Sequence, residues 1–239
     1  YVDASRSKGE LARPPKALEL PRPDQPTSQT SSTTTFQQEM PQASVIFDRA
    51  ITVLSAVFES IEKGSKADFE QLNDVVQDCV NSVIRNESAL YWLSLVNRHD
   101  TSIVDHTLRV TILSLILGRE DGQAPEALAH LGLSSLLHDI GMLKISKEIL
   151  EKPDALTEQE IALVKRHPAF ARDILKEQGG FPEKVIETVL CHHERLDGQG
   201  YPLALSAYAI PRMAKILAIT DSYEALTSDR SYRSANSSL

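Results

Sequence analysis

The chain has 239 residues, a formal net charge of −8 and 41% hydrophobic residues, which is enough apolar material for one sizeable core. An acidic excess argues against a protein that binds a phosphate backbone, so we expect neither DNA nor RNA as a partner. Cys79 and Cys191 form no CxxC motif, which indicates a reducing compartment without a disulfide framework. No apolar run approaches a membrane span and no secretion signal opens the chain, so we expect a cytoplasmic protein.

Residues 1–41 are rich in proline and contain a Ser/Thr/Gln tract at residues 27–35. Such a segment cannot bury enough apolar surface to order itself, and we predict a disordered linker. Its five basic residues cancel its five acidic ones, so the acidic excess belongs to the part that follows. A chain that opens on a linker is expected to continue from an accessory domain upstream.

Residues 42–98 are expected to form connecting helices. Apolar residues recur at helical spacing from Ala43 to Ile61, and a second such pattern runs from Asp68 to Ile84. Nothing in this segment indicates chemistry, and the simplest interpretation is packing of the helices on each other or on a second copy of the chain, as in a homodimer through residues 43–97. A third helix is expected to carry Leu90, Trp92, Leu93, Leu95 and Val96.

The rest of the chain also shows helical patterns and no convincing strand alternation, so we predict an all-α fold. A capping pattern at Thr157 and Glu160 opens one of these helices. The glycine-rich residues 197–202 are a loop by composition. The further helices are expected at residues 102–117, 126–138, 158–176, 183–191 and 211–227.

Histidine and aspartate side chains at the ends of apolar helices indicate a metal site. His138 and Asp139 follow the apolar residues 131–137, and His192 and His193 end another apolar helix. Consecutive residues on a helix point about 100 degrees apart, so the paired histidines could serve different metals or two sides of one. Imidazole together with carboxylate suits iron, manganese or zinc.

Each of these residues also has a plainer interpretation. His106 or His167 alone would more often be a hydrogen-bonded polar residue, and Asp221, which interrupts an apolar helix, could be an internal cap. Their joint occurrence is what favours a metal site. His99 and His130 lack such settings, and we expect both to be surface or structural residues.

Three segments resemble the HD-GYP family of bacterial phosphodiesterases, and the resemblance covers about residues 98–233. They are His-Asp-Ile-Gly at 138–141, His-His-Glu-Arg-Leu-Asp-Gly-Gln-Gly-Tyr-Pro at 192–202 and Asp-Ser-Tyr-Glu-Ala-Leu-Thr-Ser at 221–228. The middle motif is highly specific. The resemblance implies an HD-domain helical bundle at residues 99–239 that binds divalent metal, with iron or manganese favoured, and hydrolyses cyclic di-GMP.

The resemblance also implies the roles of particular residues. His138 and Asp139 would be catalytic, with Asp139 bridging two metals. Two cations can neutralise a phosphodiester and lower the pKa of a bridging water, whose hydroxide then attacks, so no protein nucleophile is required. The implied metal ligands are His106, His138, Asp139, His167, His192, His193 and Asp221. The expected substrate contacts are Arg195, Gly200, Tyr201, Pro202 and Lys144.

The chain departs from the family pattern at several positions. Met142 stands where a lysine is usual, which leaves open whether Lys144 replaces it. Ser102 stands where three-metal members carry a glutamate, so we expect two metals and linear pGpG, rather than GMP, as the main product. Glu224 stands where aspartate is common and could support the site from behind the ligands. The chain ends soon after Arg233, where family members continue, so we expect a fragment or a domain without its closing helices.

Two other functions stay open at this stage. One keeps the metal site and changes the substrate to another cyclic dinucleotide or nucleotide phosphoester, because the sequence does not specify contacts to the bases. The other is a signalling module that binds nucleotide and turns it over slowly, as Met142 and Glu224 would allow. The complete set of seven ligands favours catalysis.

Overall fold

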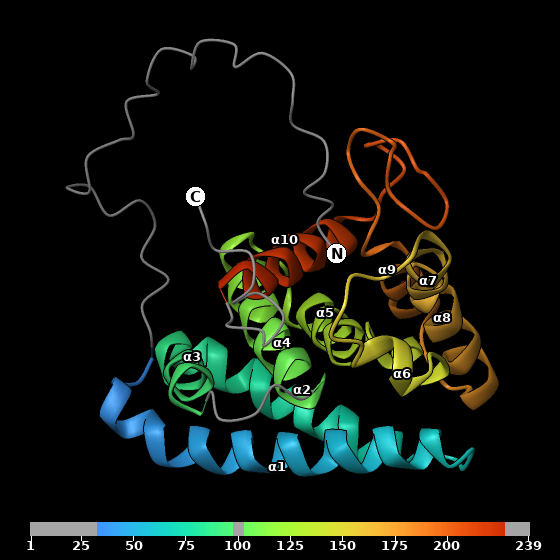
Figure 1. The fold of residues 1–239 in the computed structure, drawn as a ribbon. Helices are drawn as coiled ribbons and strands as arrows, with labels where there is room; N and C mark the ends of the chain where they lie inside the picture. The colour runs from blue at the N-terminus through green and yellow to red at the C-terminus, as the bar shows by residue number, and fades with distance from the viewer. Residues whose placement is uncertain (1–32, 98–102, 228–239) are drawn as a thin grey trace.

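The computed structural model describes residues 33–97 and 103–227, and every regular element within these ranges is helical, as predicted. The helices, labelled in Figure 1, are α1 Phe36–Glu62, α2 Phe69–Arg85, α3 Glu87–Val96, α4 Ile103–Glu120, α5 Pro125–Leu137, the 3₁₀ helix η1 Ile140–Lys144, α6 Lys147–Leu150, α7 Glu158–Val164, α8 His167–Gln178, α9 Glu183–Cys191 and α10 Arg212–Thr227.

Helix α1 runs along one side of the molecule, with α2 and α3 packed against it (Figure 1). It begins at Phe36, earlier than the predicted start at Ala43, so residues 36–41 of the expected linker are helical. A capping box and a contact with α2 explain the early start. Thr35 and Gln38 form a capping box, and the buried carboxylate of Glu39 accepts hydrogen bonds at 2.8 and 2.7 Å from Arg85 of α2.

Helices α4 and α5 lie at the centre, between the connecting helices and the elements that follow (Figure 1). The second half of α5, residues 131–137, is buried on all sides, which explains its continuous apolar sequence. Gly118 lets α4 approach α5 closely, because a Cβ there would lie 2.7 Å from the side chain of Leu131. One apolar core continues from α1 through α9, so the connecting helices share it with the rest of the fold.

The single helix predicted at residues 158–176 is wrong, because the structure divides it into α7 and α8. Pro168 lies in the first turn of α8, where its missing N–H costs no hydrogen bond, and it could not continue α7 because it has no N–H to donate to the carbonyl of Val164. The break puts His167 at the first position of α8. None of the helices within the described residues is long and apolar enough to cross a membrane.

Candidate metal centre

The seven predicted ligands come from five parts of the chain and meet in one place. α4 carries His106 in its first turn, the end of α5 carries His138 and Asp139, and α8 begins with His167. His192 and His193 follow at the end of α9, and α10 carries Asp221. Close contacts between ring nitrogens, carboxylate oxygens and rings connect all seven. Tertiary packing therefore assembles a set that is spread over more than one hundred residues of sequence.

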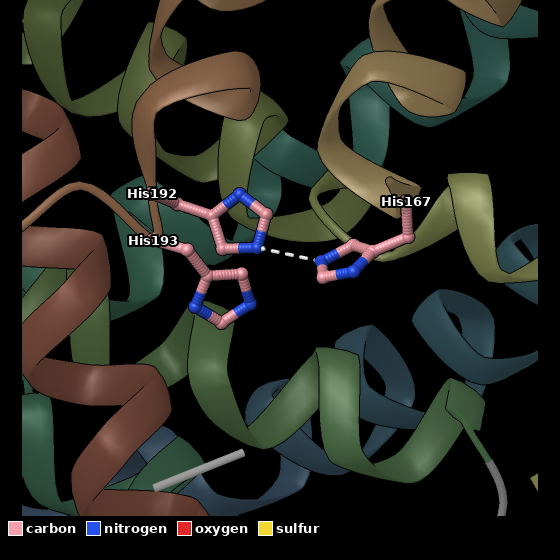
Figure 2. A group of neighbouring side chains, drawn as sticks. All are labelled: His167, His192 and His193. Atoms are coloured by element: carbon pink, nitrogen blue, oxygen red, sulfur yellow. Dashed lines mark hydrogen bonds between the residues drawn. The ribbon is translucent and has the colours of Figure 1, made fainter. Parts of the chain in front are cut away.

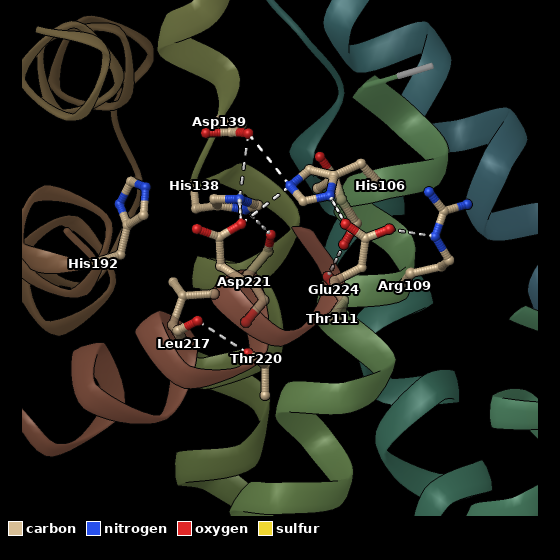
Figure 3. A network of polar contacts seen from close by, with 12 residues as sticks. His106, Arg109, Thr111, His138, Asp139, His192, Leu217, Thr220, Asp221 and Glu224 are labelled. Atoms are coloured by element: carbon tan, nitrogen blue, oxygen red, sulfur yellow. Dashed lines mark hydrogen bonds and ion pairs between the residues drawn. The ribbon is translucent and has the colours of Figure 1, made fainter. Parts of the chain in front are cut away.

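The first group consists of His106, His138 and Asp139, whose candidate ligand atoms lie within 4.8 Å of one another. The Oδ2 atom of Asp139 is 3.6 Å from Nε2 of His106 and 3.4 Å from Nε2 of His138. Asp221 joins this group, because its Oδ1 atom is 3.2 Å from His106 Nε2 and 3.9 Å from His138 Nε2. Figure 3 shows both carboxylates turned toward the two imidazole rings.

The second group consists of His167, His192 and His193, whose ligand atoms also lie within 4.8 Å of one another. Figure 2 shows the three rings facing one another from two chain segments. The Oδ1 atom of Asp139 is 3.3 Å from Nε2 of His167. The two oxygens of Asp139 therefore face different groups, so each group has one of these oxygens within reach.

Three of the imidazole rings are each fixed by a carbonyl group three residues earlier in the chain. The Nδ1 atoms of His138, His167 and His192 lie 2.8, 2.8 and 2.6 Å from the carbonyl oxygen three residues earlier, to which each ring donates Nδ1–H. Each Nε2 atom then offers a bare lone pair to the centre. The Nε2 atoms of His167 and His192 face each other at 3.2 Å, and the buried Nε2 of His138 has no hydrogen-bond partner among the described residues. Converging lone pairs without protons fit divalent cations.

The protonation states also suit metal binding, with one exception. Burial lowers the pKa of His192 and brings that of His193 to about 3, so both rings are neutral at pH 7. Burial would raise the pKa of Asp139, but the neighbouring histidines, His138 first, hold it well below its usual range. The exception is His106, whose pKa burial would lower but hydrogen bonds to Asp221 and Glu224 raise to about 9.

Gly141 allows the two groups to meet. A Cβ atom at this position would lie 2.0 Å from the carbonyl oxygen of His167 and 2.6 Å from the backbone nitrogen of Ala171. Only glycine lets η1 pack this closely on α8, and η1 directly follows Asp139. The glycine in the His-Asp-Ile-Gly motif therefore brings Asp139 within reach of His167.

The loop after α9 is held by Glu194, a residue of the middle motif to which the sequence analysis gave no role. Its buried carboxylate accepts backbone N–H groups of Leu203 at 2.6 Å and Leu205 at 2.8 Å. A Cβ at Gly200 would lie 2.5 Å from the Cα of Glu194, so the loop packs back on the helix end. The ring of Tyr201 stacks on His193, with centroids 4.8 Å apart.

The predicted substrate contacts are distributed around the centre. Gly200 packs against the backbone of Glu194 and Arg195, and the ring of Tyr201 lies beside His193. The peptide bond between Tyr201 and the exposed Pro202 is cis. Lys144 is exposed, and the guanidinium group of Arg195 donates to Asp197 at 2.7 Å. The roles of these residues as substrate contacts stay predictions.

A small cavity adjoins the second group. It measures about 30 Å³ and is lined by Met142, Lys165 and Tyr201 together with His167 and His193. The ammonium group of Lys165 lies 5.7 Å from the centre of the Tyr201 ring. The sequence analysis missed Lys165, although its position two residues before a candidate ligand was the available signal. Met142 therefore lies close to the second group, and Lys165, which directly follows α7, lines the same cavity.

His99 and Ser102 lie outside the described residues, as do residues 1–32 of the expected linker and the end of the chain from residue 228 onward. His130, expected to be a surface or structural residue, is partly exposed on α5 and lines a groove of about 730 Å³ between α2, α5 and the turn before α9. It belongs to neither histidine group.

Comparison with known proteins supports the resemblance seen in the sequence. A family model described as HD domain matches residues 92–238. A cyclic di-GMP phosphodiesterase of Pseudomonas aeruginosa is 32% identical over 235 residues, which are 98% of this chain and 56% of that protein. A 3'3'-cGAMP-specific phosphodiesterase of Vibrio cholerae is 38% identical over 150 residues, which are 62% of this chain and 34% of that protein. The chain thus spans less than two thirds of either relative.

A solved structure shows the same fold. It is an HDGYP protein from Bdellovibrio bacteriovorus, which aligns with a TM-score of 0.67 and 24% sequence identity over 82% of this chain and 63% of that chain. The predicted all-α fold with an HD-type helical bundle is therefore confirmed.

Proposed function

This chain belongs to the HD domain family, and on that premise we propose that it is a metal-dependent phosphodiesterase that hydrolyses cyclic di-GMP to linear pGpG. One carboxylate oxygen of Asp139 faces the first group and the other faces the second, and this observation carries the proposal. A carboxylate shared by two groups of ligands suits a pair of cations, and a phosphodiester is the anionic substrate that such a pair activates. The relative named as a cyclic di-GMP phosphodiesterase aligns over 98% of the chain, including α1 to α3, which supports the substrate.

The proposed metal ligands are the seven that the sequence analysis predicts. His106, His138 and Asp221 would hold one divalent ion, the histidines of the second group would hold the other, and Asp139 would contribute to both. Bound cations would neutralise the scissile phosphate and supply hydroxide near neutral pH. Iron or manganese is favoured by the resemblance to the HD-GYP family, since the ligand chemistry alone also suits zinc, and two ions are proposed rather than three.

The chain's own residues would fix the geometry of the reaction. Carbonyl groups in three helices orient the imidazole rings, and Glu194 holds the loop that presents Gly200 and Tyr201. Lys165 and Met142 stand beside the second group and would meet the substrate there. Burial of the centre excludes bulk water and strengthens each charge interaction.

The test is metal analysis coupled to product chromatography. Anaerobically purified protein loaded with Fe²⁺ or Mn²⁺ should bind about two equivalents and convert cyclic di-GMP to pGpG. His138→Ala should abolish turnover, whereas His130→Ala on the same helix should not, because His130 lies in neither group. Bound metal with untouched substrate would instead support a nucleotide-binding signalling module.

A second candidate substrate is 3'3'-cGAMP, which the similar Vibrio cholerae enzyme is named for. That similarity covers 150 residues, which are 62% of this chain. Competition between the two cyclic dinucleotides at equal concentration decides between them, because the preferred substrate is consumed first.

We also propose that the connecting helices form a homodimer. Apolar side chains remain exposed on α1 and α3, and Phe36 and Trp92 stack edge to face there. Trp92 is 46% exposed and Val45 is 67% exposed, which supports an apolar face available to a second copy. Light scattering after gel filtration should give twice the monomer mass, and Trp92→Glu should return the monomer mass. A cytoplasmic location stays a prediction from the sequence.

A further inference from the structure

His106 is held differently from the three histidines whose rings are fixed by a carbonyl group three residues earlier. Its Nδ1 atom contacts Oε2 of Glu224, which lies on α10 and not on its own helix α4. The orientation of this ring therefore depends on the packing of two helices. Figure 3 shows His106 between the two aspartates on one side and Glu224 on the other.

Glu224 in turn depends on Arg109. Its carboxylate is buried, with the residue 2% exposed, and its other oxygen accepts a hydrogen bond at 2.7 Å from Nε of Arg109. The Arg109 side chain is itself only 11% exposed. A buried carboxylate needs opposite charge and hydrogen-bond donors, and Arg109 supplies both.

These contacts form a bracket between α4 and α10. His106 and Arg109 stand three residues apart on α4, and Asp221 and Glu224 stand three residues apart on α10, so each pair lies on one helix face. His106 touches both carboxylates of α10, and Arg109 secures the second. We call these four residues the α4–α10 bracket.

We propose that Arg109 is a positioning residue which acts through Glu224 on His106 and so sets the metal affinity of the first group separately from the second. This inference rests on the proposed metal-dependent function. Arg109 is not one of the seven proposed ligands. It holds Glu224, Glu224 holds the imidazole, and the imidazole presents Nε2 to the position shared with His138, Asp139 and Asp221.

The two groups should respond separately because they are anchored separately. The rings of His167 and His192 are fixed by carbonyl groups within α7 to α9, and His193 stacks on Tyr201. Loosening the bracket frees a ring of the first group and leaves these anchors in place. Substitution of a residue that orients a metal ligand through a hydrogen bond typically weakens metal affinity by about 10- to 100-fold.

The experiment is a calorimetric titration of the metal-free full chain with Mn²⁺, with free Mn²⁺ followed by electron paramagnetic resonance. Arg109→Gln should bind one equivalent with wild-type affinity and the other about 10- to 100-fold more weakly. Arg109→Lys, which keeps the charge, should recover part of the loss. Arg119→Gln is the matched control, because Arg119 lies on the same helix and pairs with Glu87 and the carbonyl of Val83.

The outcomes separate the inference from the function on which it rests. Unchanged affinity for both equivalents in Arg109→Gln, or equal weakening of both, overturns the inference and leaves the proposed function intact. Wild-type protein that binds no Mn²⁺ overturns both. Circular dichroism checks folding, and if Arg109→Gln does not fold, Glu224→Gln, which keeps the shape of the side chain, must show the same selective loss or the inference fails.

Discussion

The connecting helices α1 to α3 and the later helices α4 to α10 bury different kinds of side chain. In the first region the buried polar residues are few, and Glu39, Ser82 and Asn86 gather where the start of α1 meets the end of α2. In the second region imidazoles, carboxylates and hydroxyls are buried at the convergence of five chain segments. The two regions share one apolar core. Helices α1 to α3 bury mostly apolar side chains, whereas α4 to α10 also bury polar groups that meet at the candidate metal centre.

The difference is visible in the helices themselves. α2 alternates buried apolar residues such as Leu72 and Val76 with exposed polar ones, as expected of a helix that covers a core. The second half of α5 has no exposed face and ends directly at His138 and Asp139. Burial on all sides brings the end of α5 into the interior, where His138 is 0% exposed.

The largest effect is expected at the residue that joins the two groups. Asp139→Asn removes a charge that both groups face, so we expect activity to fall by more than the roughly 100-fold typical of supporting residues, with the fold retained. Initial rates with cyclic di-GMP measure this. Asp173→Asn is the control, since Asp173 is exposed and pairs with Arg172 on α8. Equal rates for the two variants would contradict a bridging role.

The next effect should separate stability from chemistry. Leu72→Ala in α2 removes a fully buried side chain, 0% exposed, and should lower the free energy of unfolding by about 2 to 5 kcal/mol. Urea denaturation measures the change, and Asn73→Ala, at the exposed neighbouring residue on the same helix, should change it by less than about 0.5 kcal/mol. The folded Leu72→Ala protein should keep its metal affinity. A lost metal equivalent would show that the two regions are more tightly coupled than we describe.

A smaller loss is expected from a single added methyl group near the centre. Gly141→Ala places a Cβ against backbone atoms of α8 and should cost about 1 to 3 kcal/mol in unfolding free energy while separating Asp139 from His167. Gly132→Ala is matched, because its Cβ would meet only side chains, Val76 at 3.0 Å and Leu115 at 3.2 Å. Thermal denaturation and metal titration of both variants test this. Loss of metal affinity in Gly132→Ala alone would refute it.

The smallest expected effect is the release of one proton from His106 when metal binds. The pKa of His106, which burial would lower, is raised by hydrogen bonds to Asp221 and Glu224 to about 9, so the metal-free ring is protonated at pH 7. Binding of a metal ion to the first group should therefore release about one proton at pH 7. The metal affinity of this group should rise with pH up to about 9. In the metal-free protein, the stability that this charged ring contributes is lost as the pH rises through about 9.

Calorimetry in buffers of different ionisation enthalpy counts the proton. The second group should release none between pH 7 and 9, because burial, followed by the charge of His167, lowers the pKa of His193 to about 3. Proton release from both groups, or from neither, would contradict the difference between them.

The sequence by itself determined the helical class, most helix positions and the identity of the seven candidate ligands. Periodicity reports which face of a helix is buried, and histidines at the ends of apolar helices stand out against that pattern. It could not place the start of α1 or the break at Pro168. The early start of α1 is supported by the pairing of Glu39 with Arg85 of α2, whereas the break follows from Pro168, a local signal that the apolar periodicity does not include.

Only the tertiary structure decided how the ligands are divided. Three arrangements depend on how α4, α5, α8, α9 and α10 pack. Asp139 faces both groups, Glu194 holds the loop, and Arg109 donates a hydrogen bond to Glu224. Periodicity in a sequence fixes the direction of a side chain relative to its own helix. The distances between side chains on different helices come from close approaches such as that of Gly141 to α8, which no local pattern contains.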